Sequence, residues 1–292
     1  MAGLNGLERI DLDRLTDFIL QRQKSDGCFA TSPSLPSTVA DTWYGVSLCR
    51  LLDDLFPGAC LAKALDRDKI LFFVRRHEDL IASLPLRIVF FLASLHKFAT
   101  GQWPHLPDHL LDRFSKQTLT CSHLFYLRQL FPRQCSGLQA RKPDRYRVTC
   151  RDFYFCLKAG ESGNKEMADW LCRCQNDDGG FGFFPGTTSY MEYCDYSLSA
   201  LYLLGRRPVY RQRASDFIVY CQAGSGGFAR AIRALPFLEA SWHAIHALAV
   251  LSGTKNPLDA SSVEEQHQPG EPLCGRSKVG VRYILPNEIP IG

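Results

Sequence analysis

The sequence contains no long hydrophobic run. Its longest mostly apolar stretch, residues 88–95, is well short of the roughly 20 residues that cross a bilayer as a helix. The first residues, MAGLNGLERIDLD, also lack the apolar segment of a secretory signal peptide. We therefore expect no transmembrane segment and a cytoplasmic protein.

The chain also carries little net charge of either sign. The formal net charge is +4 over 292 residues, and the basic residues gather in two connector-like segments, 140–147 and 206–213. Solvated linkers account for such segments, with an acidic lipid surface or protein partner as the alternative, so we expect no nucleic-acid partner. A glycine-rich phosphate loop and a serine nucleophile elbow are both absent from the sequence.

Cysteine is not scarce, because the chain contains 12 of them. They are spread along the chain, and several fall inside apolar helical patterns, where reduced cysteine behaves as a small hydrophobic residue. Cys172 and Cys174 resemble a metal-binding pair, but two residues apart on a helix they point to nearly opposite faces. We therefore expect reduced cysteines in a reducing compartment.

Three segments of the chain superpose without gaps and form an internal repeat. Each begins with Asp, an aromatic residue and an aliphatic residue, and each continues to the motif Gln-x-x-[Asp or Ser]-Gly-[Cys or Gly]-Phe. The copies run from Asp17 to Phe29, from Asp169 to Phe181 and from Asp216 to Phe228. Agreement at this density is not expected by chance.

Each copy predicts a helical hairpin. The first helix ends at the glycines, because glycine adopts a left-handed helix cap without strain, and a loop rich in Pro, Ser, Thr and Gly follows. A second helix then runs over about 42–52, 196–204 and 241–251. The 47-residue step from Gln175 to Gln222 is a sensible length for one hairpin.

The segment from about 60 to 157 lacks the glycine turn but still predicts helices. Room remains there for two degenerate hairpins, one over 68–98 and one over 106–157. The repeats thus indicate one all-helical domain over 1–253. The polar segment 254–292 is predicted to be an irregular C-terminal tail.

The motif Gln-x-x-Asp-Gly-Gly-Phe followed by an Ala/Leu-rich helix resembles the repeat of the prenyltransferase and squalene-cyclase family, within the terpenoid-cyclase superfamily. The resemblance implies an all-α fold, the α/α-toroid, in which the first helix of each hairpin is outer and the second is inner. It also implies an inner cavity for an isoprenoid or a prenyl diphosphate. By the same resemblance, a protein-prenyltransferase β-subunit works beside a helical-repeat partner subunit.

Each well-formed repeat places a carboxylate just before its second helix, namely Asp41, Glu192 and Glu239. Acids in the first turn of a helix satisfy free backbone N–H groups and the helix dipole, which is the structural interpretation. The functional alternative places these acids around one mouth of the toroid as ligands or proton donors.

The resemblance also implies a zinc site. Protein-prenyltransferase β-subunits bind zinc through Asp-x-Cys before one inner helix and a His in the next, and the metal makes a substrate thiol a thiolate. The equivalents here are Glu192, Cys194 and His243. Glu192 stands where the family has Asp. When the two second helices are aligned at their ends, Leu201 and Leu248, Cys194 and His243 differ in position by about two residues. A buried cysteine and a core histidine are the alternative interpretation.

The cations that bind diphosphate in this family precede the Asp-x-Cys, but the corresponding loop here, 182–190, contains no Lys or Arg. Arg230 and Arg233 in the equivalent loop of the last repeat are the nearest substitutes, because guanidinium pairs bidentately with phosphate. The alternative is that both arginine side chains are simply solvated at the protein surface.

Two other functions remain open. A terpene cyclase that protonates an alkene usually carries the motif Asp-x-Asp-Asp, which is absent from this sequence. The first candidate for the acid is then Asp195, and the other candidates are Asp41 and Glu239. A non-catalytic binding scaffold is the third hypothesis. Several aromatic residues line an isoprenoid cavity or belong to an ordinary core: Trp43, Tyr44, Phe183, Tyr190, Tyr193, Tyr196 and Trp242.

Overall fold

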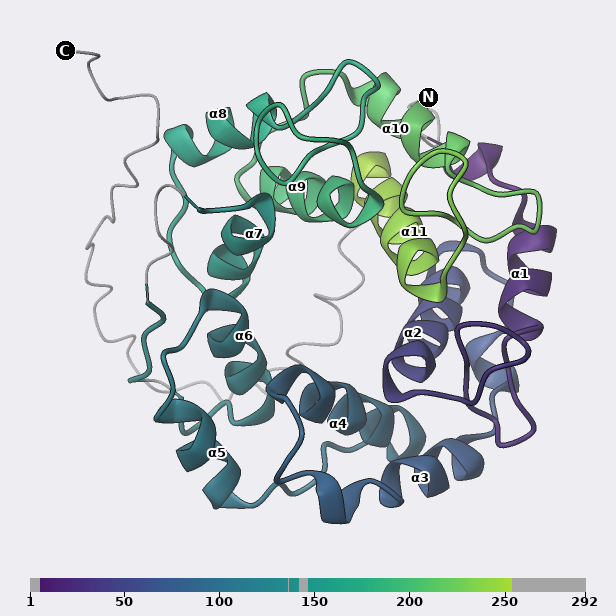
Figure 1. Cartoon of the computed structure of the whole chain (residues 1–292), viewed down its shortest axis with the longest axis vertical. Helices are drawn as coiled ribbons and strands as arrows, with labels where there is room; N and C mark the ends of the chain where they lie inside the picture. The colour runs from purple at the N-terminus through teal and green to yellow at the C-terminus, as the bar shows by residue number, and fades with distance from the viewer. Residues whose placement is uncertain (1–5, 136, 142–146, 254–292) are drawn as a thin grey trace, which may run out of the picture.

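The computed structural model describes residues 6–135, 137–141 and 147–253, and these residues form a ring of helices (Figure 1). The described part contains eleven α-helices and no strand, which confirms the predicted all-α toroid. The predicted tail, 254–292, lies outside the described residues. No helix of the described part combines the length and the apolar character needed to cross a bilayer.

Two concentric sets of helices make up the ring (Figure 1). The outer helices are α1 (Leu12–Leu20), α3 (Arg67–Arg75), α5 (Asp108–Ser115), α8 (Lys165–Arg173) and α10 (Arg211–Tyr220). The inner helices are α2 (Val39–Leu55), α4 (Leu86–Thr100), α6 (Cys121–Leu130), α7 (Cys150–Lys158), α9 (Met191–Leu203) and α11 (Leu238–Ser252). Each inner helix packs against the next, and α11 packs against α2, which closes the ring.

The glycine turn of each repeat docks on the outer helix of the next repeat. The Gln222 side chain makes a two-way bond with the backbone of Asp11: its Oε1 accepts the Asp11 N–H at 2.9 Å, and its Nε2 donates to the Asp11 carbonyl at 3.0 Å. Gln175 forms the same pair of bonds with Tyr210. Gln175 and Gln222 of the repeated motif therefore each join one repeat to the next, and Gln222 joins the last repeat to the first.

Glycine is required in these turns for a steric reason. A Cβ at Gly226 would lie 2.0 Å from the Arg14 carbonyl oxygen, and one at Gly179 would lie 2.1 Å from the Arg213 carbonyl oxygen. Both glycines also have a positive φ, 94° and 88°. The turn thus allows a close contact with the next outer helix. These glycines do not end a helix, contrary to the prediction, because α1, α8 and α10 each end six or seven residues before them.

The structure differs from the sequence-based prediction in three further places. The second helices begin at Val39, Met191 and Leu238, earlier than expected, so the acids before them lie within the first turn. The second degenerate hairpin is α5 with α6, followed by α7, which has no outer helix before it in the described residues. One disulfide, Cys121–Cys156, joins α6 to α7, although reduced cysteines were expected.

Candidate functional site

The inner helices surround a central cavity of about 530 Å³, which is within the usual size range of small-molecule sites. The fifth and sixth residues of every inner helix lie at the same level around it. These pairs are Trp43-Tyr44, Phe90-Phe91, Phe125-Tyr126, Tyr154-Phe155, Asp195-Tyr196 and Trp242-His243. All of them except Asp195 line the cavity.

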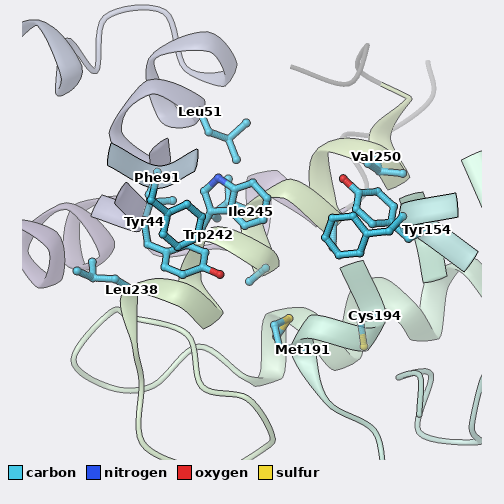
Figure 2. Packing of buried hydrophobic residues seen from close by; sticks show 14 of the residues in the cluster. Tyr44, Leu51, Phe91, Tyr154, Met191, Cys194, Leu238, Trp242, Ile245 and Val250 are labelled. Carbon is cyan, nitrogen blue, oxygen red and sulfur yellow. The ribbon is translucent and has the colours of Figure 1, made fainter. Parts of the chain in front are cut away.

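These pairs form a continuous belt of rings. Trp43 stacks on Phe91 with ring centroids 4.3 Å apart, and Tyr154 lies 5.3 Å from Tyr196. Figure 2 shows Tyr44, Phe91 and Trp242 packed together. A belt of this kind offers apolar area to a prenyl chain and electron-rich ring faces to a carbocation.

The structure separates the expected aromatic residues into two groups. Trp43, Tyr44, Tyr196 and Trp242 line the cavity. Phe183, Tyr190 and Tyr193 are not among the described lining residues and pack on one another at the loop before α9 instead. The sequence reasoning missed the pairs of α4, α6 and α7, whose signal was an aromatic doublet in each degenerate helix.

Asp195 occupies the position where every other inner helix carries an aromatic residue. Its carboxylate is 2% exposed and lies between two buried histidines of α11. Oδ2 accepts from His243 Nδ1 at 2.6 Å, and Oδ1 accepts from His246 Nδ1 at 2.5 Å. The cluster therefore joins α9 to α11 by two hydrogen bonds inside the core.

The electrostatics of this cluster favour an ionised Asp195. Burial alone would raise the pKa of Asp195, but the charge interaction with His246 and the hydrogen bonds from both histidines outweigh burial and hold its pKa well below the ordinary value. Asp195 is therefore a carboxylate that orients the histidines, and it holds no proton to donate. This differs from the expectation that Asp195 itself is a protonated acid.

His243 is the member of the cluster that faces the cavity. Because the ionised carboxylate accepts from Nδ1, the neutral ring carries its lone pair on Nε2. That Nε2 is buried and has no hydrogen-bond partner within the described chain. Buried polar atoms are normally satisfied, so an unpaired nitrogen in a cavity wall indicates a group that acts on a ligand.

A second polar network lies at the N-terminal ends of the inner helices. Glu239 accepts hydrogen bonds from Tyr44 Oη at 2.7 Å and from Arg87 Nη2 at 3.0 Å. Arg230 joins Glu239 to Glu192, with 3.0 Å to the first and 2.6 Å to the second. Burial would raise the pKa of Glu239, but Tyr44, His243 and Arg87 together lower it. Both glutamates are thus ion-paired acceptors.

The remaining expected site residues lie apart from the cavity. Asp41 accepts from the hydroxyl groups of Thr31 and Thr38 and belongs to the N-terminal cap of α2. Arg233 is exposed and has a positive φ of 65°. Arg230 is already paired with two carboxylates, which reduces its availability for a diphosphate.

Glu192, Cys194 and His243 do not fit a zinc ion. Glu192 binds Arg230, and Nδ1 of His243 is bonded to Asp195. Burial raises the pKa of Cys194 well above its ordinary value, which disfavours the thiolate that zinc requires. Throughout the described residues, no cluster of three His, Cys, Asp or Glu side chains is arranged to hold a metal.

Cys194 has a structural role that recurs in the other repeats. Its Sγ accepts the N–H of Phe181 at 3.3 Å. The hydroxyls of Thr42 and Ser241 accept the N–H of the matching phenylalanine, at 3.2 Å and 2.9 Å. The three side chains occupy one repeat position, 13 residues after their phenylalanine.

We expect Cys194→Ser to leave the fold and the ligand binding of the protein intact, because a hydroxyl accepts the matching phenylalanine N–H in two other repeats. Cys194→Val removes the acceptor and should cost about 1–3 kcal/mol of unfolding free energy, the usual cost of an unsatisfied buried N–H. Thermal unfolding and the zinc content of both variants are the measurements. Stoichiometric zinc in the wild type that disappears in Cys194→Ser would support the metal site instead.

Comparison with known proteins agrees with this architecture. The model of the prenyltransferase alpha-alpha toroid domain matches residues 1–80, 148–194 and 186–268, well over half of the chain. A drimenyl diphosphate synthase from Streptantibioticus cattleyicolor is 26% identical over 232 residues, which cover 73% of this chain and 40% of that protein. The chain thus spans well under half the length of this relative. The chain belongs to the prenyltransferase alpha-alpha toroid family.

Proposed function

We propose that this toroid binds an isoprenoid in its aromatic cavity and acts on it as a terpene-cyclase-like enzyme, with His243 as the proton-transfer residue. The observation that carries the proposal is the unpaired Nε2 of His243, which is buried in the wall of an aromatic cavity and held by Asp195. An oriented imidazole beside electron-rich rings suits a reaction that passes through a carbocation.

Each group has a defined task in this proposal. The aromatic belt holds the chain and stabilises positive charge on carbon. Nε2 of His243 takes a proton from a carbon next to the cation, and the electrons of that C–H bond form the new double bond. Asp195 stabilises the resulting imidazolium. The imidazolium formed on His243 then gives this proton to the alkene of the next substrate, where the π electrons form the new C–H bond and leave the carbocation. The proton added equals the proton lost, so the reaction is an isomerisation and requires no co-reactant.

The comparisons support the substrate class. The relative named above is a synthase of a diphosphate ester by its name, and the family is one of isoprenoid-handling toroids. Zinc-dependent transfer of a prenyl group to a thiol is less well supported, because the donor set for the metal is not assembled in the described residues.

We expect purified protein to convert farnesyl or geranylgeranyl diphosphate into a cyclic isomer, with no loss of activity in EDTA. His243→Gln should lower the rate by about 100-fold or more, the usual contribution of a proton-transfer residue. Gas chromatography with mass detection, before and after phosphatase treatment, measures the products.

The matched control is His77→Gln. His77 lies two residues past the end of α3, and its Nδ1 donates to the Phe73 carbonyl, outside the described cavity lining. Its substitution should leave the rate unchanged. Wild-type protein that binds both substrates but forms no cyclic isomer would contradict the proposal and favour a binding scaffold. Activity that is lost in EDTA and restored by zinc would favour the thiol transferase.

A further inference from the structure

The chemistry of the cavity changes along the inner helices. The aromatic belt lies near their N-terminal ends, and the walls become polar one to two turns further on. The lining residues of this second level on α2, α4, α6 and α7 are Arg50, Lys97, Gln129 and Lys158. Lys63, in the segment between α2 and α3, and Arg67, the first residue of α3, complete the level. We refer to Arg50, Lys63 and Arg67 as the basic triplet.

Positive charge exceeds negative charge at this level. The lining acids here are Asp53 and Asp54. Asp53 is committed to the backbone, since its carboxylate accepts from the N–H groups of Leu61 at 2.6 Å and Ala62 at 3.1 Å. The basic triplet therefore lines the cavity without a carboxylate committed to it, at exposed positions where the cavity meets the solvent.

The basic triplet differs from the arginines at the other end of the cavity. Arg87 and Arg230 are both ion-paired with Glu239. Arg50 and Lys63 form no ion pair or hydrogen bond with the described residues, and Arg67 lies over the ring of Phe98 at 4.9 Å. Cations without a carboxylate partner are the ones available to bind an anion.

We infer that the basic triplet binds the diphosphate of a prenyl diphosphate, at the end of the cavity opposite Glu239. This inference rests on the proposed function, which places the isoprenoid chain in the cavity. It adds the position at which the diphosphate headgroup binds. Arg50 and Arg67 supply planar donors that match phosphate oxygens bidentately, and Lys63 supplies a point charge. The chain then extends from the triplet through the aromatic belt.

The geometry has a consequence for the reaction. Arg50 follows Tyr44 by six residues on α2, and a rise of 1.5 Å per residue puts the two levels about 9 Å apart. Tyr44 and His243 are at the same level, with ring centroids 6.0 Å apart. His243 therefore lies beside distal carbons of the chain and away from the ester oxygen.

A structural role for these cations makes a different prediction. Arg50 lies toward the C-terminal end of α2, where a positive side chain interacts favourably with the helix dipole and contributes a few tenths to one kcal/mol of stability. Lys63 and Arg67 would then be solvated surface cations. Under that explanation, removing the charges changes thermal stability and leaves ligand affinity as it was. The two explanations separate in a binding experiment.

The test uses the triple variant Arg50→Gln, Lys63→Gln, Arg67→Gln. Its matched control is Arg75→Gln, Arg76→Gln, which removes exposed charges near the end of α3 outside the described cavity lining. The probes are farnesyl diphosphate, farnesol and inorganic pyrophosphate, with affinities measured by calorimetry and by quenching of Trp43 and Trp242 in the cavity wall.

We expect the wild type and the control to bind farnesyl diphosphate at least tenfold more tightly than farnesol. The triple variant should lose this difference while its farnesol affinity stays the same. Pyrophosphate should bind weakly to the wild type and not to the triple variant. Equal affinities of the triple variant and the wild type for farnesyl diphosphate would overturn the inference, as would a wild type that does not prefer the diphosphate.

These outcomes are distinct from failure of the proposed function. Binding of farnesyl diphosphate that depends on the triplet, without any cyclic product, would leave the headgroup site standing and reject the cyclase. Cyclic product formed by the triple variant at an unchanged KM would leave the cyclase standing and reject the headgroup site.

Discussion

Asp195→Ala is expected to lower the unfolding free energy by about 3 kcal/mol or more, because removing one partner of a buried ionic or hydrogen-bonded cluster leaves the others uncompensated. The Nδ1 groups of His243 and His246 would both lose their acceptor inside the core. The variant should also lose the proposed cyclase activity, since nothing would fix the tautomer of His243. Urea unfolding followed by circular dichroism, at neutral pH, measures the stability.

The pH dependence of stability gives a second readout of the same cluster. The pKa of Asp195 is lower in the folded chain than its ordinary value near 4, so its contribution is present above about pH 4 and is lost as the pH falls below that value. Asp195→Asn removes the titrating group and should make stability less steeply dependent on pH in the acid range. Asp54→Ala, at an exposed position, is the control and should change stability by less than about 0.5 kcal/mol. If the unfolding free energy of Asp195→Asn and of the wild type fell equally steeply as the pH is lowered below about 4, the result would contradict an ionised Asp195.

Gly226→Ala is expected to cost about 2–5 kcal/mol of unfolding free energy. One part is the positive φ of 94°, which costs an alanine roughly 1–2 kcal/mol. The other is a new Cβ only 2.0 Å from the Arg14 carbonyl oxygen, which forces α1 away from the last repeat. Because this contact closes the ring, the loss should appear as a lower midpoint in thermal unfolding.

Gly186→Ala is the matched control for this prediction. Gly186 also has a positive φ, 80°, but an added Cβ would meet nothing within 4 Å. Only the backbone part of the cost applies, about 1–2 kcal/mol. If Gly226→Ala were as stable as Gly186→Ala, the contact with Arg14 would not be what holds the ring closed.

Much of the fold followed from local patterns. The glycines of each Gln motif marked the turn that follows an outer helix, and the loop after them returns the chain antiparallel. They do not end the helix itself, which stops before the Gln of the motif. The degenerate segment kept the apolar spacing of helices, so α3 to α7 were predicted without the motif. The helix α7 was predicted, but as part of the second degenerate hairpin and not as a further inner helix, because an inner helix without an outer partner leaves no signature in spacing.

The candidate site could be predicted only in part. Four of the aromatic residues proposed to line a cavity do so, namely Trp43, Tyr44, Tyr196 and Trp242. His243 was identified by resemblance, in a zinc set that the described residues do not assemble. The basic triplet was not found, because Arg50, Lys63 and Arg67 belong to three different elements that meet only in the folded ring.

The sequence by itself determined the all-helical ring, since a repeated helix, glycine turn and helix cannot bury its apolar face without a neighbouring copy. Only the tertiary structure decided what Asp195, Cys194 and Glu192 do. Asp195 and Cys194 are adjacent in the chain, but successive residues of a helix point about 100° apart, so one meets two histidines and the other a backbone N–H. Side-chain chemistry at such positions depends on which neighbouring helix each residue faces, and that is fixed by the packing of the ring.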